Sequence, residues 1–348
     1  MTGRQDSTHS ADDAAAPAVA QVREGILEIP GAVKLFHGAT LHGVKLAWRM
    51  VGPTTSPVVL ALGGISANRR VFSPDAQTAG WWQEVVGPGR ALATDGIRLL
   101  SFDYLGGSGE TTGPRDTAGF PSVSTYDQAE LLLRLLNHLG IKSLHTAAGA
   151  SYGGMVALAF AERYPDRVSR LLVISAGDRA HPMATAWRTV QRHTVRLAQS
   201  VGKADQGVVL ARALAMASYR THEEFSARFA GSPRQTPDGF VFPVEEYLFA
   251  RGHEYAARTQ PEAFLCLSES IDLHRLDAGR IFVPTTAVAV REDQLVPLAD
   301  MRAMAARLPN AKLYEVSSVY GHDAFLKEAE QLQPIFARTL PASSGANK

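Results

Sequence analysis

The chain has 348 residues, and its 35 basic and 34 acidic side chains give a formal net charge of +1. These charges show no long run of one sign, which disfavours nucleic acid or an anionic membrane as a partner and favours small-molecule substrates. The single cysteine, Cys266, excludes an intramolecular disulfide and a multi-cysteine metal site, and it fits a reducing compartment. It lies in the apolar run 264–267 (FLCL), which predicts a packed thiol and not a nucleophile.

Length and local composition predict one domain with an insertion. Residues 1–20 are rich in Ala, Asp, Ser and Thr and lack the apolar stretch of a secretory signal, so a disordered tail is expected. No window approaches the roughly 18 uninterrupted apolar residues of a membrane helix, and we expect a soluble, cytoplasmic protein. A chain of this length commonly forms one α/β core with an inserted subdomain. We expect a core made of 21–177 and 278–340, and a helical cap at 178–277.

In chain order, the first half alternates short apolar runs with longer helical patterns. Buried strands are predicted at 58–62, 98–103, 144–148 and 171–175. Helices are predicted at 124–139, where apolar residues recur at helical spacing before Gly140, and at 155–164. This alternation is typical of a mostly parallel sheet with helices on both faces.

In the second half, strand signals fade between 178 and 277, and helical patterns such as 208–214 (VVLARAL) replace them. This stretch is the predicted cap. The sheet resumes at 285–290, followed by a helix at 298–308 and a last strand at 312–316.

A G-x-S-x-G pattern surrounds Ser151, between a predicted strand and a predicted helix. This is the context of a nucleophile elbow, a sharp turn that exposes a serine hydroxyl. An acid and a histidine should follow in that order, each after a later strand. Asp293 lies three residues beyond the strand ending at 290, and His322 follows the last strand. The pattern predicts a catalytic triad of Ser151, Asp293 and His322 on an α/β-hydrolase fold, with Glu292 as the alternative acid.

A serine nucleophile also needs donors for the oxyanion that forms during attack. The backbone N–H of Tyr152, directly after the serine, is one candidate, and that of Ile65, in the glycine-rich turn after the first strand, is the other. No metal site is predicted, because no His or Cys cluster has ligand spacing.

Further stretches resemble the motifs of the homoserine O-acyltransferase family, and the resemblance covers roughly 58–326. The matching segments are 80–82 (GWW), 86–89 (VGPG), 94–95 (TD), 105–109 (LGGSG), 112–114 (TGP), 120–123 (FPSV), 151–155 (SYGGM), 210–212 (LAR), 218–221 (SYRT) and 321–323 (GHD). Such a series of motifs is far more specific than the elbow alone.

The resemblance implies that Ser151, Asp293 and His322 form the family's triad and that Arg212, Asp323 and Tyr219 bind the amino acid substrate. A guanidinium suits an α-carboxylate, and a carboxylate suits an α-ammonium. Without the resemblance, Arg212 reads as a solvated charge on a cap helix, and Asp323 as a residue that caps the following helix. The resemblance also implies a homodimer formed through the cap, acyl-CoA as co-substrate with no permanently bound cofactor, and a place in methionine biosynthesis.

The sequence departs from the family pattern near the expected substrate pockets. The loop 64–70 (GISANRR) lacks the usual histidine, and the segment 196–207 is short and lacks a W-x-G-x-Y stretch. Arg69, Arg70 and Arg291 flank the oxyanion turn and the acid loop. They could pair there with the distal carboxylate of a succinyl group, which favours succinyl-CoA over acetyl-CoA as donor.

Four alternatives remain open: a homoserine O-acetyltransferase, an acyltransferase for serine or another alcohol, an esterase or thioesterase on the same triad, and a binding module that has lost its activity. The last predicts the loss of a triad residue, and none is lost.

Overall fold

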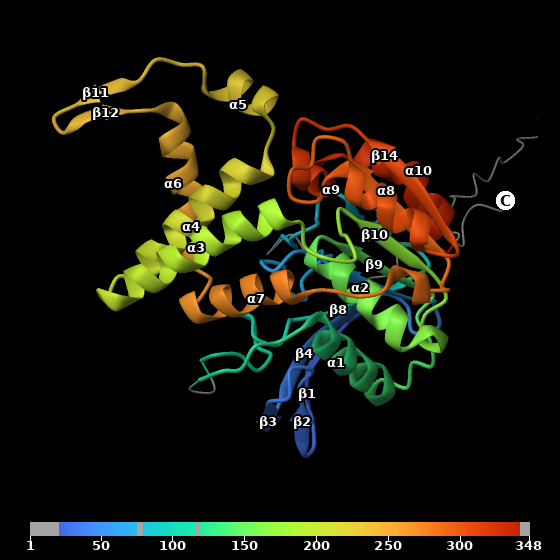
Figure 1. Ribbon diagram of the computed structural model, residues 1–348. Coiled ribbons are helices and arrows are strands. Elements are labelled where there is room, and N and C mark those ends of the chain that lie inside the picture. Colours follow the sequence, from blue (N-terminus) through green and yellow to red (C-terminus); the bar gives the residue numbers. More distant parts are fainter. Residues whose placement is uncertain (1–20, 75–78, 116–118, 342–348) are drawn as a thin grey trace, which may run out of the picture.

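The computed structural model describes residues 21–74, 79–115 and 119–341, so the tail predicted at 1–20 lies outside it. Its centre is an eight-stranded sheet in the spatial order β1-β4-β8-β5-β9-β10-β13-β14 (Figure 1). β1 and β8 both pair with β4 in antiparallel fashion, and the other neighbours are parallel. The prediction of a mostly parallel central sheet flanked by helices is confirmed.

Six of the eight strands overlap the runs predicted from the sequence, and β1 and β4 were not predicted. The eight strands are β1 (Val22–Glu28), β4 (Lys45–Val51), β5 (Val58–Leu62), β8 (Arg98–Phe102), β9 (Thr146–Ala150), β10 (Leu171–Ile174), β13 (Thr285–Val290) and β14 (Ala311–Val316). Two short pairs lie outside it: β2 (Ala32–Lys34) with β3 (Thr40–His42), and β6 (Val86–Gly87) with β7 (Leu92–Ala93).

The sheet separates two apolar cores. Along β5, Val58, Leu60 and Leu62 pack on one face, whereas Val59 and Ala61 pack on the other. Successive side chains of a strand point to opposite faces, so a strand covered on both sides buries every residue and reads as a continuous apolar run.

Helices cover both faces of the sheet. The first core contains residues of α1 (Thr125–His138), α2 (Tyr152–Arg163) and α8 (Leu298–Arg307). The second contains residues of α9 (Ala324–Lys327), α10 (Ala329–Thr339) and the segments 71–72 and 82–97. A capping box between Ser124 and Asp127 begins α1, and Gly140, at φ 66°, follows its end.

Between β10 and β13 the chain forms a layer of its own, at the left of Figure 1, which we call the cap. Its helices are α3 (Pro182–Ser200), α4 (Ala204–Tyr219), α5 (His222–Phe229), α6 (Pro243–Ala256) and α7 (Pro261–Leu273). α4 packs against both α3 and α6. The sequence pattern missed a hairpin here, β11 (Arg234–Thr236) with β12 (Gly239–Val241), because three-residue strands are too short to show alternation. None of the described helices combines the length and hydropathy needed to cross a membrane.

Candidate active site

Ser151 occupies the turn between β9 and α2, and its backbone is strained, with φ 54° and ψ −124°. The glycines of the motif allow this turn. A Cβ on Gly149 would overlap the backbone of Gly153, and a Cβ on Gly153 would overlap the carbonyl group of Leu62. The strained serine therefore lies at the carboxyl end of the sheet, where open α/β sheets bind their ligands.

The structure brings Ser151, His322 and Asp293 into one hydrogen-bonded chain. His322 Nε2 lies 2.9 Å from Ser151 Oγ, and His322 Nδ1 lies 2.7 Å from Asp293 Oδ2. The other carboxylate oxygen, Oδ1, accepts hydrogen bonds from the backbone N–H groups of Leu295 and Val296, which hold the carboxylate in place. This is the geometry of a nucleophile, a base and a residue that orients the base.

Glu292, the alternative acid, points away from the histidine. Its carboxylate accepts hydrogen bonds from the Ser317 hydroxyl and the Ser318 backbone N–H. Of the two consecutive acids, only Asp293 contacts His322.

The surroundings of His322 raise its pKa. Burial lowers the pKa, but the charge and hydrogen bond of Asp293, together with the charge of Asp323, more than offset it, so the net shift is upward from 6.5. A raised pKa means that the site stabilises the imidazolium, the form that a serine proton would create.

The two expected oxyanion donors belong to segments that adjoin Ser151. Tyr152 begins α2, and a Cβ on Gly64, the neighbour of Ile65, would lie 4.0 Å from Ser151 Oγ. Among the backbone hydrogen bonds within the described ranges, none uses the N–H of Tyr152 or Ile65 as donor. Both groups are therefore free to receive an oxyanion beside the serine.

Buried contacts hold this site rigid. The backbone N–H of Gly153 donates to the carbonyl oxygen of Gly63, and the Tyr104 hydroxyl donates to the same oxygen. The Tyr152 hydroxyl, where the family motif has a methionine, lies 2.7 Å from the Ser270 hydroxyl on α7. The elbow is thus tied both to the oxyanion loop and to the cap.

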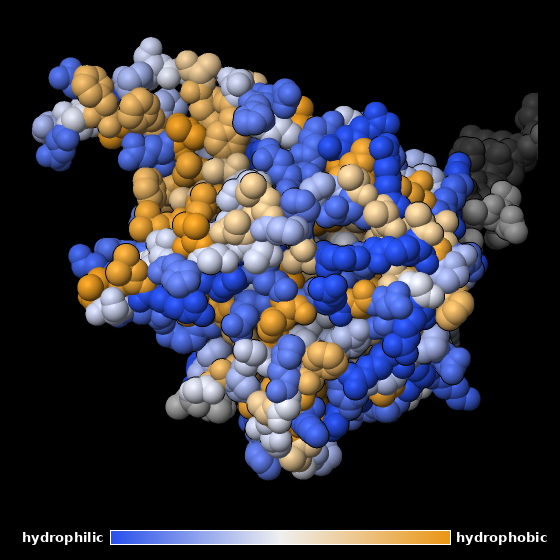
Figure 2. Space-filling view, viewed as in Figure 1, coloured by the Kyte–Doolittle hydropathy of each residue, from blue (hydrophilic) through white to orange (hydrophobic). Residues whose placement is uncertain are grey.

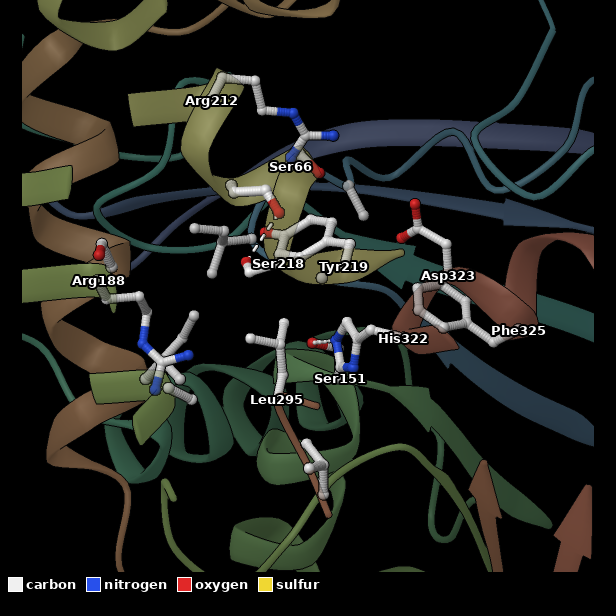
Figure 3. Close-up of a pocket in the computed structure, with 18 of the residues that line it drawn as sticks. Ser66, Ser151, Arg188, Arg212, Ser218, Tyr219, Leu295, His322, Asp323 and Phe325 are labelled. Atoms are coloured by element: carbon white, nitrogen blue, oxygen red, sulfur yellow. Dashed lines mark hydrogen bonds between the residues drawn. The ribbon is translucent and has the colours of Figure 1, made fainter. Parts of the chain in front are cut away.

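Ser151 opens onto a cavity of about 390 Å³ between the core and the cap (Figure 3). Its floor includes residues 64–68, Ser151 and His322, and its roof includes Arg188, Arg212 and Tyr219 from α3 and α4. The cap thereby screens the serine from bulk water.

Arg212 reaches into this cavity and is not a solvated surface charge. Its guanidinium carbon lies 4.8 Å from the ring centre of Tyr255 and 5.4 Å from that of Tyr219. Its Nε is buried without a hydrogen-bond partner. No ion pair between described residues involves Arg212, so a cation is available to an anionic group of a ligand.

Asp323 and Tyr219 lie next to the catalytic histidine candidate. Asp323 is buried and its Oδ2 pairs with Arg220 Nη2 at 3.1 Å. Its side chain makes no capping hydrogen bond to the following helix. The ring of Tyr219 lies 5.7 Å from that of His322. Both residues line the cavity, as does Arg212 (Figure 3).

The expectation that Arg69 and Arg291 could pair with a distal carboxylate of the donor is wrong. Arg69 is bound to Asp103 and Glu110 outside the cavity. Arg291 is exposed and pairs with Glu315. Arg70 does line the cavity, although its guanidinium is 3.6 Å from Glu24. Side chains that flank a loop in the sequence can point away from the cavity that the loop lines, and of these three arginines only Arg70 lines it.

The structure brings Arg188, which the sequence reasoning missed, into the cavity instead. Arg188 and Arg192, one turn apart on α3, share the carboxylate of Asp272 through Arg188 Nε and Nη2 and Arg192 Nη1. Two partly buried guanidinium groups thus face one carboxylate and leave one excess positive charge. The signal in the sequence was a pair of arginines spaced four apart on a helix face that also carries the buried Gln191 and Val195.

Two remaining expectations concern metals and the cysteine. Among the described residues, no group of three or more His, Cys, Asp or Glu side chains is arranged to hold a metal ion. Cys266 is partly exposed, and burial raises the pKa of its thiol to about 12, which keeps it protonated and unreactive.

Known proteins resemble this chain in sequence and in structure. The family model for the alpha/beta hydrolase fold matches residues 57–329. A homoserine O-succinyltransferase of Xanthomonas campestris pv. campestris is 42% identical over 98% of this chain and 89% of its own. A serine O-succinyltransferase of Litchfieldella anticariensis is 31% identical over 91% and 98%. The crystal structure of a homoserine O-acetyltransferase from Bacillus anthracis aligns with a TM-score of 0.82 at 19% identity and covers 93% of this chain and 99% of its own.

Proposed function

This chain belongs to the homoserine O-acyltransferase family of the α/β-hydrolase fold, and we propose that it transfers an acyl group from an acyl-CoA to the hydroxyl of L-homoserine, a step of methionine biosynthesis. Succinyl-CoA is the proposed donor. The observation that carries the proposal is the Ser151–His322–Asp293 chain opening onto a capped cavity that also holds the unpaired guanidinium of Arg212.

The first half of the reaction acylates the enzyme. Ser151 Oγ attacks the thioester carbonyl while its proton passes to His322 Nε2, and Asp293 stabilises the imidazolium. The N–H groups of Ile65 and Tyr152 bind the oxyanion. The C–S bond then breaks, and the departing CoA thiolate takes the proton from His322, so that CoA leaves as a neutral thiol and the histidine returns to its neutral form. This half-reaction requires no permanently bound cofactor.

The second half passes the acyl group to the acceptor. The homoserine hydroxyl attacks the acyl-enzyme while its proton moves to His322, and the intermediate collapses with return of that proton to Ser151. The cap keeps water out, because water would otherwise hydrolyse the ester.

Two charged residues of the cavity lining, Arg212 and Asp323, orient the acceptor. Arg212 pairs with the α-carboxylate, since its guanidinium has no carboxylate partner in the described chain. Asp323 pairs with the α-ammonium through the oxygen that Arg220 does not use. An alcohol without an α-carboxylate would leave Arg212 without an anionic partner.

The choice of succinyl over acetyl rests on Arg188. Its side chain is 12% exposed and lines the cavity, and Figure 3 places it on the opposite side of Ser151 from Asp323. Its Nε and Nη2 are held by Asp272, which leaves Nη1 for a further acceptor. A succinyl group carries a carboxylate that fits this position, and an acetyl group does not.

The first experiment is initial-rate release of CoA from succinyl-CoA and from acetyl-CoA, each with L-homoserine, with L-serine and without an acceptor. The proposal expects release that depends on homoserine and is faster with succinyl-CoA. Release that needs no acceptor would identify a thioesterase, and faster release with serine would identify a serine acyltransferase. Ser151→Ala is the control, with an expected loss of at least roughly 1,000-fold, because the nucleophile is removed.

We further propose a cytoplasmic homodimer that associates through the cap. Large apolar side chains are exposed on this part of the molecule, among them Leu197 at 70% and Val201 at 66%. Figure 2 shows apolar residues gathered on the cap side of the molecule. Light scattering coupled to size-exclusion chromatography measures the mass directly, and Leu197→Glu should shift a dimer to the monomer.

A further inference from the structure

A second cavity of about 390 Å³ adjoins the first between α4, α5 and α6, and we call it the basic groove. Five arginines line it: Arg212, Arg220, Arg228, Arg251 and Arg258. We propose that the basic groove binds the phosphate groups of the acyl-CoA while the thioester lies at Ser151. The inference rests on the proposed use of a CoA thioester and adds where its anionic end lies.

The charges of the basic groove favour a polyanion. Glu254 and Asp323 are the acids of its lining, and Glu224 pairs with two of the arginines from beside it. Five guanidinium groups therefore face three carboxylates, which leaves an excess of two positive charges. Arg251 is half exposed and pairs with Glu254. In the described chain, no ion pair uses Arg258.

The basic groove adjoins the catalytic cavity and shares part of its lining. Arg212, Tyr255, Arg258 and Asp323 line both. CoA carries its thiol at one end of a long flexible pantetheine arm and its diphosphate and 3′-phosphate at the other. A ligand with this shape can place its thioester carbonyl beside Ser151 and its phosphates among the arginines.

Guanidinium groups suit phosphates because the planar fork donates two parallel hydrogen bonds to two oxygens. Homoserine and the succinyl group do not need this site, since each offers one carboxylate and the catalytic cavity holds Arg212 and Arg188 for them. Arg251 lines the basic groove and not the catalytic cavity, Arg258 lines both, and neither has another assignment. The phosphates of CoA are the part of the substrates that remains to be matched.

The test removes charge from the groove and compares donors with and without phosphates. Isothermal titration of CoA and of adenosine 3′,5′-bisphosphate into the full chain measures binding without turnover. The double variant Arg251→Gln/Arg258→Gln should weaken both ligands at least tenfold, since each lost charge-assisted contact contributes about tenfold. Arg302→Gln, which removes an exposed arginine from α8 and lines neither cavity, is the matched control and should bind both ligands like the parent.

A kinetic ratio separates phosphate binding from general damage. The ratio of kcat/KM for succinyl-CoA to that for succinyl-pantetheine, which lacks the phosphates, should fall by the same factor in the double variant. Higher ionic strength should also lower this ratio, because it screens exposed charges. Arg251→Gln alone, at an exposed site, repeats the test should the double variant be unstable.

Two results would overturn the inference: unchanged affinity for both phosphate ligands in the double variant, or an equal fall in kcat/KM with both donors. Failure of the proposed function looks different. In that case the parent protein would release no CoA in a homoserine-dependent reaction, while the titrations would still report whether the groove binds CoA.

Discussion

Arg188→Gln tests the link between one guanidinium of the cavity lining and the choice of acyl donor. The variant keeps a polar but shorter side chain and removes the charge that faces the cavity. We expect kcat/KM with succinyl-CoA to fall and kcat/KM with acetyl-CoA to change little, because only the succinyl group carries a carboxylate.

The size of the effect follows from the contact that is lost. A hydrogen bond to a charged group contributes about 1.5–3 kcal/mol, and each 1.36 kcal/mol corresponds to a factor of ten in rate. The expected fall with succinyl-CoA is therefore roughly 10- to 150-fold. Arg188 Nη1 is the donor available for this contact, since Nε and Nη2 already bind Asp272.

The same substitution also affects stability, and this must be measured apart. Asp272 would keep Arg192 Nη1 at 2.6 Å and the Thr185 hydroxyl at 2.7 Å, so its carboxylate would not be left unpaired. Thermal unfolding checks that the variant is folded at the assay temperature. Arg196→Gln, which removes an exposed arginine from the same helix, is the matched control and should leave the donor ratio unchanged.

The assay is initial-rate CoA release with each donor at saturating L-homoserine. An equal fall with both donors would mean that Arg188 acts only through the structure of the cap. Unchanged kinetics with succinyl-CoA would place the succinyl carboxylate elsewhere in the cavity. Either result refutes the assignment of Arg188 as the donor-selecting residue.

Three further predictions concern the triad, the elbow and a buried histidine. The proposed base, His322, must be neutral to accept a proton, and its pKa is raised because the effect of Asp293 outweighs that of burial. A pH–rate profile of kcat/KM should therefore show an acid limb with its midpoint above pH 6.5. Asp293→Asn should lower this midpoint, and it should lower kcat by at least roughly 1,000-fold. Gly153→Ala should lower the free energy of unfolding by about 1–3 kcal/mol in a denaturant titration, because the added Cβ would overlap a carbonyl group of β5. In the control Gly231→Ala the added Cβ meets only a side-chain atom, at 3.6 Å, and the free energy of unfolding should stay close to that of the parent. Burial lowers the pKa of His274 from 6.5 to about 4, so the folded state favours the neutral ring. The stability that this ring contributes is complete above pH 6.5 and is lost as the pH falls toward 4, so urea titrations across this range should show the free energy of unfolding fall by up to about 3 kcal/mol. His274→Gln should flatten this decline, and a decline of equal size in that variant would contradict the assignment.

Much of the fold, and the proposed catalytic residues, can be predicted from the sequence alone, because short local patterns encode them. Strands buried on both faces are apolar along most of their length, so the runs at 58–62 and 287–290 predict strands of a parallel sheet. The strained turn at Ser151 requires glycines, which makes the elbow a short and recognisable pattern. The order of acid and histidine along the chain then points to Asp293 and His322.

Only the tertiary structure decides what depends on the direction of a side chain. Glu292 and Asp293 are equivalent in sequence, yet one bonds to Ser318 and the other to His322, because consecutive loop residues point in different directions. Arg69 and Arg291 flank the right loops and still face away from the cavity.

The substrate-facing wall of the cavity is the least predictable part for the same reason. Arg188 reaches the cavity because α3 packs against α4 and α7 within the cap, and no local pattern encodes how helices dock against one another. Local sequence determined the proposed reaction centre of this protein, and the long-range packing of the cap determined which charges surround it.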